Sequence, residues 1–153
     1  MPLDLGRPAP DFTLRDQHGR RTSLAAFRGH QAVVVMFYPY AFSRVCSGEL
    51  CEVRDAMPQF QNDDVQLLAI SCDSVFTLRA FSEHDRLEYP LLSDYWPHGA
   101  TTKDYGVFDD ISGGPKRSSF AVDKDGVVRW AAHNAIGEAR DLDEHAAALA
   151  ALV

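Results

Sequence analysis

The sequence predicts an α/β fold in which helices flank a mixed central β-sheet. Two apolar runs, 32–38 and 65–71, are too short for typical helices and indicate strands that are buried on both faces. A helical pattern follows each run, and a pair of strands joined by an Asp-Gly turn lies nearer the C-terminus. Strands that alternate with helices and end in an antiparallel pair are typical of a mixed sheet with helices on both sides.

The first elements are a hairpin, a buried strand and a helix. Residues 11–24 contain two short alternating segments separated by His18-Gly19, which is a hairpin signal. The run "AVVVMFY" at 32–38 is rich in β-branched and apolar residues and predicts a strand. A helix is expected over 46–61, because apolar residues there recur at helical spacing and form one stripe: Leu50, Val53, Met57 and Phe60.

The second half of the chain repeats the alternation and then adds a hairpin and a helix. The run "VQLLAIS" at 65–71 predicts a second buried strand, and 76–86 predicts a second helix. "SFAV" and "VVRWA" flank Asp125-Gly126 and predict a hairpin. The Ala- and Leu-rich segment 141–152 opens with acidic residues, as a helix N-terminus prefers. This order is that of a thioredoxin-like fold with an N-terminal β-hairpin extension.

Length and charge limit the classes of protein that fit. The 153 residues are 46% hydrophobic and 10% aromatic, which is enough for one sizeable core, so we expect one domain over 1–153. The formal net charge is -7 and no basic stripe offsets it, which argues against nucleic acid as a partner. Charges and prolines occupy the first residues, and no apolar run approaches the roughly 20 residues needed to span a bilayer. We therefore expect a cytoplasmic protein that does not bind membranes.

Three cysteines are the candidate reactive groups. Thiols are kept reduced in the cytoplasm, so Cys46, Cys51 and Cys72 are more consistent with catalysis, metal binding or simple burial than with a disulfide framework. The Cys46–Cys51 spacing has no second pair at zinc-finger distance and no accompanying His-x-x-x-His, so a zinc site is the weaker interpretation. No metal is expected.

Cys46 occupies a position that favours ionised sulfur. It follows a buried strand and a proline-containing loop, and it sits near the start of the predicted helix. Unpaired N–H groups and the positive end of the helix dipole favour an anion there. An accessible thiolate in such a position is a nucleophile, whereas the alternative for an arbitrary cysteine is a small buried side chain.

The surrounding residues form a recognisable pattern. The spacing Pro39-x-x-x-Ser43-x-x-Cys46 resembles the active-site signature of the peroxiredoxins, which is Pro, three residues, Thr or Ser, two residues, Cys. The blocks "GRPAPDFTLRDQHGR", "YPLLSDYWPHGATTKDYGVF" and "GGPKRSSFAVDKDG" occur in the order expected of that family. The resemblance covers nearly the whole chain and looks closest to the alkyl hydroperoxide reductase E type, whose members use one cysteine.

The resemblance implies a role for each matching residue. Cys46 would attack the terminal peroxide oxygen and become a sulfenic acid. Arg117, which precedes the strand "SSFAV", would stabilise the thiolate and donate to the peroxide oxygens. Ser43 would hydrogen-bond the thiolate and the peroxide, although Ser lacks the χ1 restriction of the more common Thr. Pro39 would shape the pocket, and Glu49 would help to hold the arginine or would simply favour the first helical turn.

Cys51 departs from the one-cysteine pattern. Its spacing from Cys46 resembles that of the resolving cysteine in the bacterioferritin-comigratory, or Q-type, peroxiredoxins. In an intact helix two Cα atoms five residues apart are about 8.6 Å apart. A disulfide tolerates at most about 7 Å, so a Cys46–Cys51 bond would require the helix to unwind. Otherwise Cys51 is a packing residue and an outside thiol resolves the sulfenic acid; Cys72 is a further candidate resolver.

The resemblance also implies partners. We expect a hydroperoxide substrate, a thioredoxin-like, mycoredoxin-like or low-molecular-weight thiol reductant, no cofactor, and a homodimer. Two other classes fit the sequence less well. A thiol-disulfide oxidoreductase usually has C-x-x-C at the helix start, and here Glu49 occupies the second cysteine position. A non-catalytic oligomer that keeps the fold would react with peroxide no faster than free cysteine does.

Overall fold

The computed structural model describes residues 2–153, and its centre is a seven-stranded mixed β-sheet. In spatial order the strands are β2 (Arg21–Ser23), β1 (Thr13–Arg15), β5 (Leu91–Ser93), β4 (Val65–Ser71), β3 (Ala32–Phe37), β8 (Arg117–Val122) and β9 (Val128–Asn134). β3 and β5 run parallel to β4, whereas β8 is antiparallel to β3 and pairs with β9 in a hairpin. The sheet is therefore mixed, as the sequence predicts.

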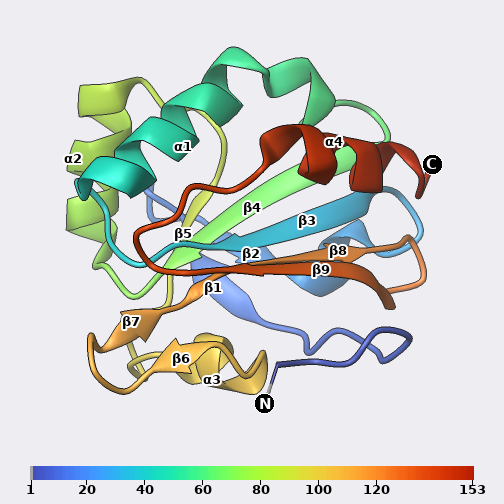
Figure 1. The fold of residues 1–153 in the computed structure, drawn as a ribbon, viewed down its shortest axis with the longest axis horizontal. Coiled ribbons are helices and arrows are strands. Elements are labelled where there is room, and N and C mark those ends of the chain that lie inside the picture. Colours follow the sequence, from blue (N-terminus) through green and yellow to red (C-terminus); the bar gives the residue numbers. More distant parts are fainter. Residues whose placement is uncertain (1) are drawn as a thin grey trace.

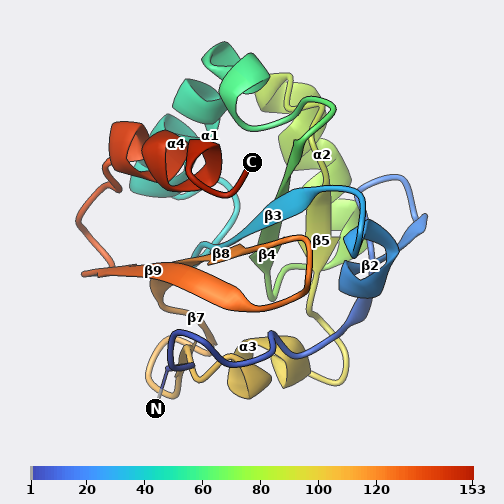
Figure 2. The same cartoon turned by 90° about the vertical axis from the view of Figure 1, so that its right-hand side faces the viewer.

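Helices cover both faces of the sheet. The helices α1 (Arg44–Asp55), α2 (Val75–Asp85) and α4 (Leu142–Ala150) lie on one face (Figure 1). The short helix α3 (Ala100–Asp104) and the small sheet of β6 (Phe108–Asp109) and β7 (Gly114–Pro115) lie on the other, as the turned view shows (Figure 2). Two 3-10 turns complete the regular structure, Leu24–Phe27 and Met57–Gln59. This arrangement is the predicted thioredoxin-like α/β fold with an N-terminal hairpin.

Strand β3 separates two apolar clusters. Its residues alternate, so that Val34 and Met36 face α1 and α4 while Val33 and Val35 face the opposite layer. Every residue of β3 is buried, which explains why its sequence is a continuous apolar run instead of an alternating one. Cys46 belongs to the cluster beneath α1. The core thus fixes the start of α1 against the end of β3.

The predicted helix over 46–61 was wrong at both ends. α1 begins at Arg44 and ends at Asp55, and a separate 3-10 turn follows over Met57–Gln59. Pro58 lies inside that turn, where its missing N–H and its ring prevent the α-helix from continuing. Phe60 is still buried, so the apolar stripe marks the core-facing side although the helix is shorter.

Several short elements were absent from the sequence prediction. They are β5, α3, β6 and β7, of two to five residues each. Segments this short carry too few residues to show a periodic pattern. No helix within residues 2–153 is long and apolar enough to cross a membrane.

Candidate active site

Cys46 lies in the first turn of α1, which follows β3 after a short loop. Its side chain is fully buried, with 0% exposure. The sequence interpretation assumed an accessible sulfur, and the structure shows it closed off from solvent within the cluster beneath α1.

Arg117 contacts the Cys46 sulfur. As the first residue of β8 it lies beside the end of β3, because Phe37 pairs with Ser118 across the antiparallel ladder. Its Nη2 group lies 3.4 Å from Cys46 Sγ. The Ile136 carbonyl accepts from Nε at 3.1 Å and from Nη2 at 2.7 Å, which fixes the plane of the guanidinium. Arg117 is thus a buried, oriented cation at the sulfur.

Glu49 joins Arg117 to a second buried arginine. Its carboxylate forms an ion pair with Arg117 Nη1 and accepts a hydrogen bond of 2.7 Å from the backbone N–H of Arg140. Arg140 Nη1 lies 3.6 Å from Glu49 Oε1, and Nη2 donates to the Phe37 carbonyl. All three side chains are almost completely buried. Sequence reasoning did not find Arg140.

The cluster carries a surplus positive charge. Burial lowers the pKa of Arg140 to about 10, which still leaves its guanidinium charged at neutral pH. Two guanidiniums therefore share one carboxylate, and Arg140 Nε and Nη1 have no hydrogen-bond partner among residues 2–153. An anion at Cys46 would neutralise this surplus.

Ser43 is the N-cap residue of α1 but does not cap it through its side chain. Its hydroxyl donates instead to the Tyr40 carbonyl at 2.9 Å. The N–H groups of the first turn therefore receive no capping oxygen from Ser43, and they point toward the end of the helix where Cys46 lies. The hydrogen bond from Ser43 to the Cys46 sulfur, which the resemblance implies, is therefore absent, because the single hydroxyl proton is directed to Tyr40. Among residues 2–153 no group donates to the Ser43 hydroxyl oxygen, so its lone pairs can accept a hydrogen bond from another molecule.

Pro39 is buried and lies in the loop between β3 and α1, residues 38–43, which we call the active-site loop. The β7 strand packs directly against it. A Cβ atom at Gly114 would lie 2.9 Å from the Pro39 carbonyl, so this contact requires glycine. The Tyr40 hydroxyl also donates to the Ser112 carbonyl in the same segment. Contacts with β7 and with the residues just before it thus hold the active-site loop in place.

Cys51 and Cys72 lie in different surroundings, and no disulfide is present among the three cysteines. Cys51 is partly buried in the same helix as Cys46, and burial raises the pKa of its thiol. Cys72 is buried after β4 beside Thr102, and burial raises its pKa to about 11. Among residues 2–153 no three His, Cys, Asp or Glu side chains form a group able to hold a metal ion.

A cysteine at a helix N-terminus, in contact with a guanidinium on a thioredoxin-like sheet, defines the class of thiol-dependent oxidoreductases. Comparison with known proteins narrows the class. Residues 5–131 match the model of the AhpC/TSA family. The chain therefore belongs to the AhpC/TSA family, and it is a peroxiredoxin, an enzyme that reduces peroxides with thiols.

Similar proteins agree with this assignment. Alkyl hydroperoxide reductase E of Mycobacterium tuberculosis is 44% identical over 150 residues, which cover 98% of each chain. The chloroplastic peroxiredoxin Q of Suaeda salsa is 36% identical over 140 residues, covering 91% of this chain and 64% of that protein. The crystal structure of peroxidoxin BcpB from Mycobacterium tuberculosis superposes with a TM-score of 0.85 at 30% identity, covering 97% of both chains.

Proposed function

We propose that Cys46 is the peroxidatic cysteine and that the enzyme reduces hydrogen peroxide and organic hydroperoxides. The observation that carries this proposal is the 3.4 Å contact between Arg117 Nη2 and Cys46 Sγ. The thiolate attacks the terminal peroxide oxygen, so that an S–O bond forms while the O–O bond breaks. Cys46 becomes a sulfenic acid, and the leaving oxygen departs as water or an alcohol after it takes a proton.

Arg117 and Ser43 would act on different parts of the peroxide. Negative charge moves from sulfur to the leaving oxygen during attack, and the Arg117 guanidinium can donate to both because its fork presents several N–H groups. The Ser43 hydroxyl, which already donates to Tyr40, accepts from the O–H of the incoming peroxide. Pro39 closes the pocket against water, and Glu49 keeps the guanidinium in place.

We propose further that Cys51 resolves the sulfenic acid. α1 includes both cysteines, so its first turns must unwind before the two sulfurs can bond. Gly48 lies between them in an open position, where an added Cβ atom would meet nothing within 4 Å. Glycine weakens a helix by about 1 kcal/mol relative to alanine, which favours unwinding at this point. The Glu49 contacts oppose unwinding, so resolution requires that the arginine cluster release this helix.

Intact mass after stoichiometric peroxide tests both proposals. We expect the wild type to lose two hydrogens, which indicates a Cys46–Cys51 disulfide, and the Cys51→Ser variant to gain one oxygen. Cys46→Ser should show neither change. Cys72→Ser serves as the matched control and should behave like the wild type.

Two results would contradict these expectations. Retention of oxygen in the wild type, without loss of hydrogen, would place resolution in an outside thiol and leave Cys46 as the peroxidatic residue. Peroxide consumption by Cys46→Ser at the wild-type rate would refute the assignment of Cys46 itself.

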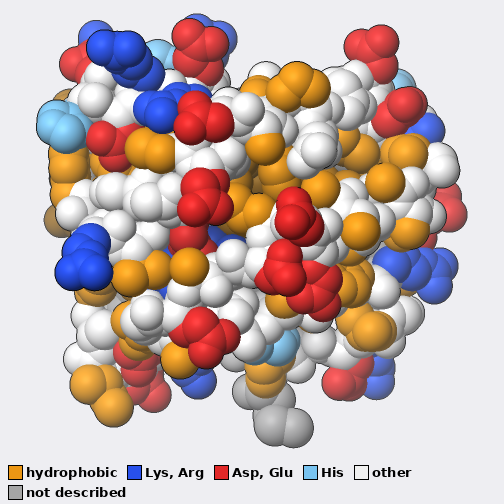
Figure 3. Space-filling view, turned by 45° about the horizontal axis from the view of Figure 1, so that its top comes forward, with side chains coloured by type: hydrophobic (Ala, Val, Ile, Leu, Met, Phe, Trp, Pro, Cys, Tyr) orange, Lys and Arg blue, Asp and Glu red, His pale blue; other side chains and the backbone are white. Residues whose placement is uncertain are grey.

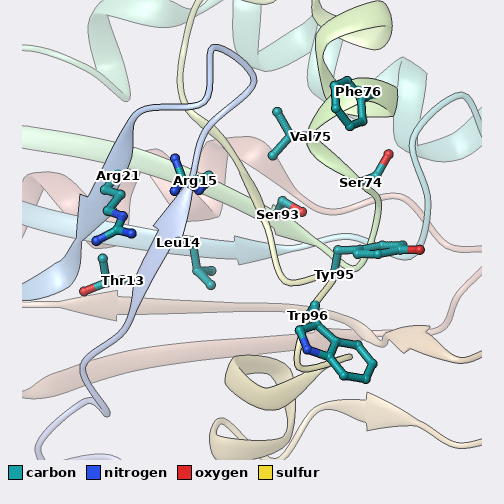
Figure 4. A pocket seen from close by; sticks show the side chains of 10 residues that line it. All are labelled: Thr13, Leu14, Arg15, Arg21, Ser74, Val75, Phe76, Ser93, Tyr95 and Trp96. Carbon is teal, nitrogen blue, oxygen red and sulfur yellow. The ribbon is translucent and has the colours of Figure 1, made fainter.

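We propose that two copies of the chain associate through an exposed aromatic surface beside the active-site loop. Phe76, Tyr95 and Trp96 are 84%, 54% and 81% exposed. They line a groove of about 710 Å³ between the start of α2, the loop after β5 and the β1–β2 hairpin (Figure 4). Large exposed aromatic side chains are enriched at protein interfaces and are unfavourable in water.

Sedimentation tests this homodimer. We expect the wild type to sediment as a dimer and Trp96→Glu as a monomer, since the substitution removes a large aromatic side chain from the proposed contact and places there a carboxylate that is costly to desolvate. Leu5→Glu, which changes another exposed apolar residue away from the groove, should leave the dimer intact. A monomeric wild type, or a dimeric Trp96→Glu, would contradict the proposed interface.

The reductant is proposed to be a thioredoxin-like or mycoredoxin-like protein or a low-molecular-weight thiol, and the compartment to be the reducing cytoplasm. Such a thiol attacks the Cys46–Cys51 disulfide and displaces one thiolate, or attacks the sulfenic acid and displaces water, and either attack forms a mixed disulfide with the protein. A second thiol then attacks this mixed disulfide, so that the reductant leaves as its own disulfide and Cys46 returns to the thiolate. Nucleic acid is not a proposed partner. On the face that carries α1 and α4, acidic, basic and apolar side chains are interspersed and no continuous basic stripe is present (Figure 3).

A further inference from the structure

We propose that Asp73 is a positioning residue for the peroxidase reaction and that it acts through the Ser43 hydroxyl. This inference rests on the proposed function of Cys46. Asp73 lies on the loop between β4 and α2, directly before Ser74, the N-cap residue of α2. It is distant in sequence from the active-site loop, and no sequence pattern gives it a role.

The Asp73 carboxylate holds one peptide group of the active-site loop. Its Oδ2 atom accepts a hydrogen bond of 2.8 Å from the N–H of Ala41. The same oxygen accepts from the Ser71 hydroxyl at 2.7 Å, and the Asp73 carbonyl accepts from Ser93 at 2.6 Å. Asp73 is therefore itself fixed by two neighbouring strands. A fixed acceptor can set the direction of the N–H group that it binds.

The Ala41 N–H belongs to the same peptide unit as the Tyr40 carbonyl. That carbonyl accepts the hydrogen bond of 2.9 Å from Ser43 Oγ. A peptide unit is planar and its N–H and C=O groups point in opposite directions. The orientation that Asp73 gives to the N–H therefore determines where the carbonyl points and hence how the Ser43 hydroxyl is directed.

Ser43 needs such support for two reasons. Serine lacks the second Cβ substituent that restricts χ1 in threonine, so its hydroxyl has more rotamers available. In addition, the neighbouring Phe42 has φ 66°, a left-handed conformation that is unfavourable for a bulky side chain. Packing of its ring on Phe81, with centroids 5.0 Å apart, and the Asp73 bond to Ala41 hold the loop in this conformation.

The first test compares reactivity toward two electrophiles. In Asp73→Ala we expect the rate constant for Cys46 oxidation by hydrogen peroxide to fall roughly 10- to 100-fold, as misplacement of a reacting group by about 1 Å does. Alkylation by iodoacetamide should be unchanged or faster, because it does not use the Ser43 hydroxyl. Asp73→Asn should stay within about 3-fold of the wild type, since its amide oxygen can accept from Ala41.

The second test is a double-mutant cycle with Ser43→Ala. If Asp73 acts through the hydroxyl, Asp73→Ala should cause no further loss in peroxide rate once the hydroxyl is removed. The control is Asp123→Ala, which removes a carboxylate that binds two backbone N–H groups in the β8–β9 turn, and it should retain the wild-type rate.

Several results would overturn the inference. One is a peroxide rate in Asp73→Ala that equals the wild-type rate, and another is an equal loss of rate toward peroxide and iodoacetamide. A loss in Asp73→Asn as large as in Asp73→Ala would also overturn it, as would an effect of Asp73→Ala that is just as large when Ser43 is already replaced by alanine. A wild type whose Cys46 does not react with peroxide would refute the proposed function, and the inference with it.

Discussion

Replacement of Arg117 by methionine is expected to lower the rate constant for Cys46 oxidation by roughly 10²- to 10³-fold, the usual cost of removing one donor from an oxyanion site. Methionine has a similar reach and is apolar, so it can fill the buried space while it removes the charge and the donors. Glu49 keeps Arg140 as a partner, and the variant should still fold. Stopped-flow measurement of thiol loss after peroxide addition gives the rate constant.

Arg117→Lys separates charge from geometry. Lysine keeps the positive charge, but it cannot bind the sulfur, Glu49 and the Ile136 carbonyl together with a planar fork. We expect its rate constant to fall between those of methionine and arginine. If the rate constant of the methionine variant is within about 3-fold of the wild-type value, the guanidinium contact does not contribute to catalysis, because loss of a contributing donor lowers the rate far more than this.

The fold class was predictable because the central strands are buried on both faces. β3 is a continuous apolar run, β4 is apolar except for Gln66 and Ser71, and the Asp125-Gly126 turn marks the β8–β9 hairpin. The elements that escaped prediction, such as β5 and α3, are held by contacts with distant segments. The buried Asp94 carboxylate, for example, accepts from the N–H groups of Thr101 and Thr102 at the start of α3. Local sequence does not reveal such contacts.

The sequence predicted those residues of the candidate site that lie at a characteristic spacing from one another along the chain. Pro39, Ser43 and Cys46 are close in sequence, and a helix start after a strand brings them together. Arg117 came from resemblance, and no local pattern places it 3.4 Å from the sulfur. The closed state of Cys46 was not predictable, because burial depends on how the active-site loop packs.

Arg140 and Asp73 had no sequence signal at all. Arg140 stands in a polar stretch, "GEARD", that is typical of an exposed loop, yet its side chain is buried against Glu49. Asp73 looks like an ordinary residue before a helix. Each derives its importance from one partner far away in sequence, Glu49 for Arg140 and Ala41 for Asp73. A pair of this kind is visible only in three dimensions.

Within the described part of the chain, Glu49 is the one carboxylate between the two buried arginines. Without its carboxylate, Arg117 and Arg140 would be two buried cations with no counter-ion between them. We expect Glu49→Ala to lower the free energy of unfolding by about 3–5 kcal/mol, the range for removing one partner of a buried ion pair. For a chain of this size each kcal/mol shifts the melting temperature by about 2–4 °C, so thermal denaturation will resolve the effect.

Glu49→Gln tests which property of the side chain matters. The amide oxygen can still accept from Arg117. The amide NH₂, however, would then face the backbone N–H of Arg140, so that two donors meet where the carboxylate of Glu49 accepts a hydrogen bond in the wild type. Glutamine should therefore be destabilising as well, although less so than alanine.

Glu83→Ala is the matched control, because Glu83 pairs with Arg79 at 3.4 Å on the surface, with both side chains more than half exposed. Its removal should cost less than about 1 kcal/mol. Equal losses in Glu49→Ala and Glu83→Ala would mean that the buried cluster tolerates two uncompensated guanidiniums, contrary to the cost expected for a broken buried ion pair.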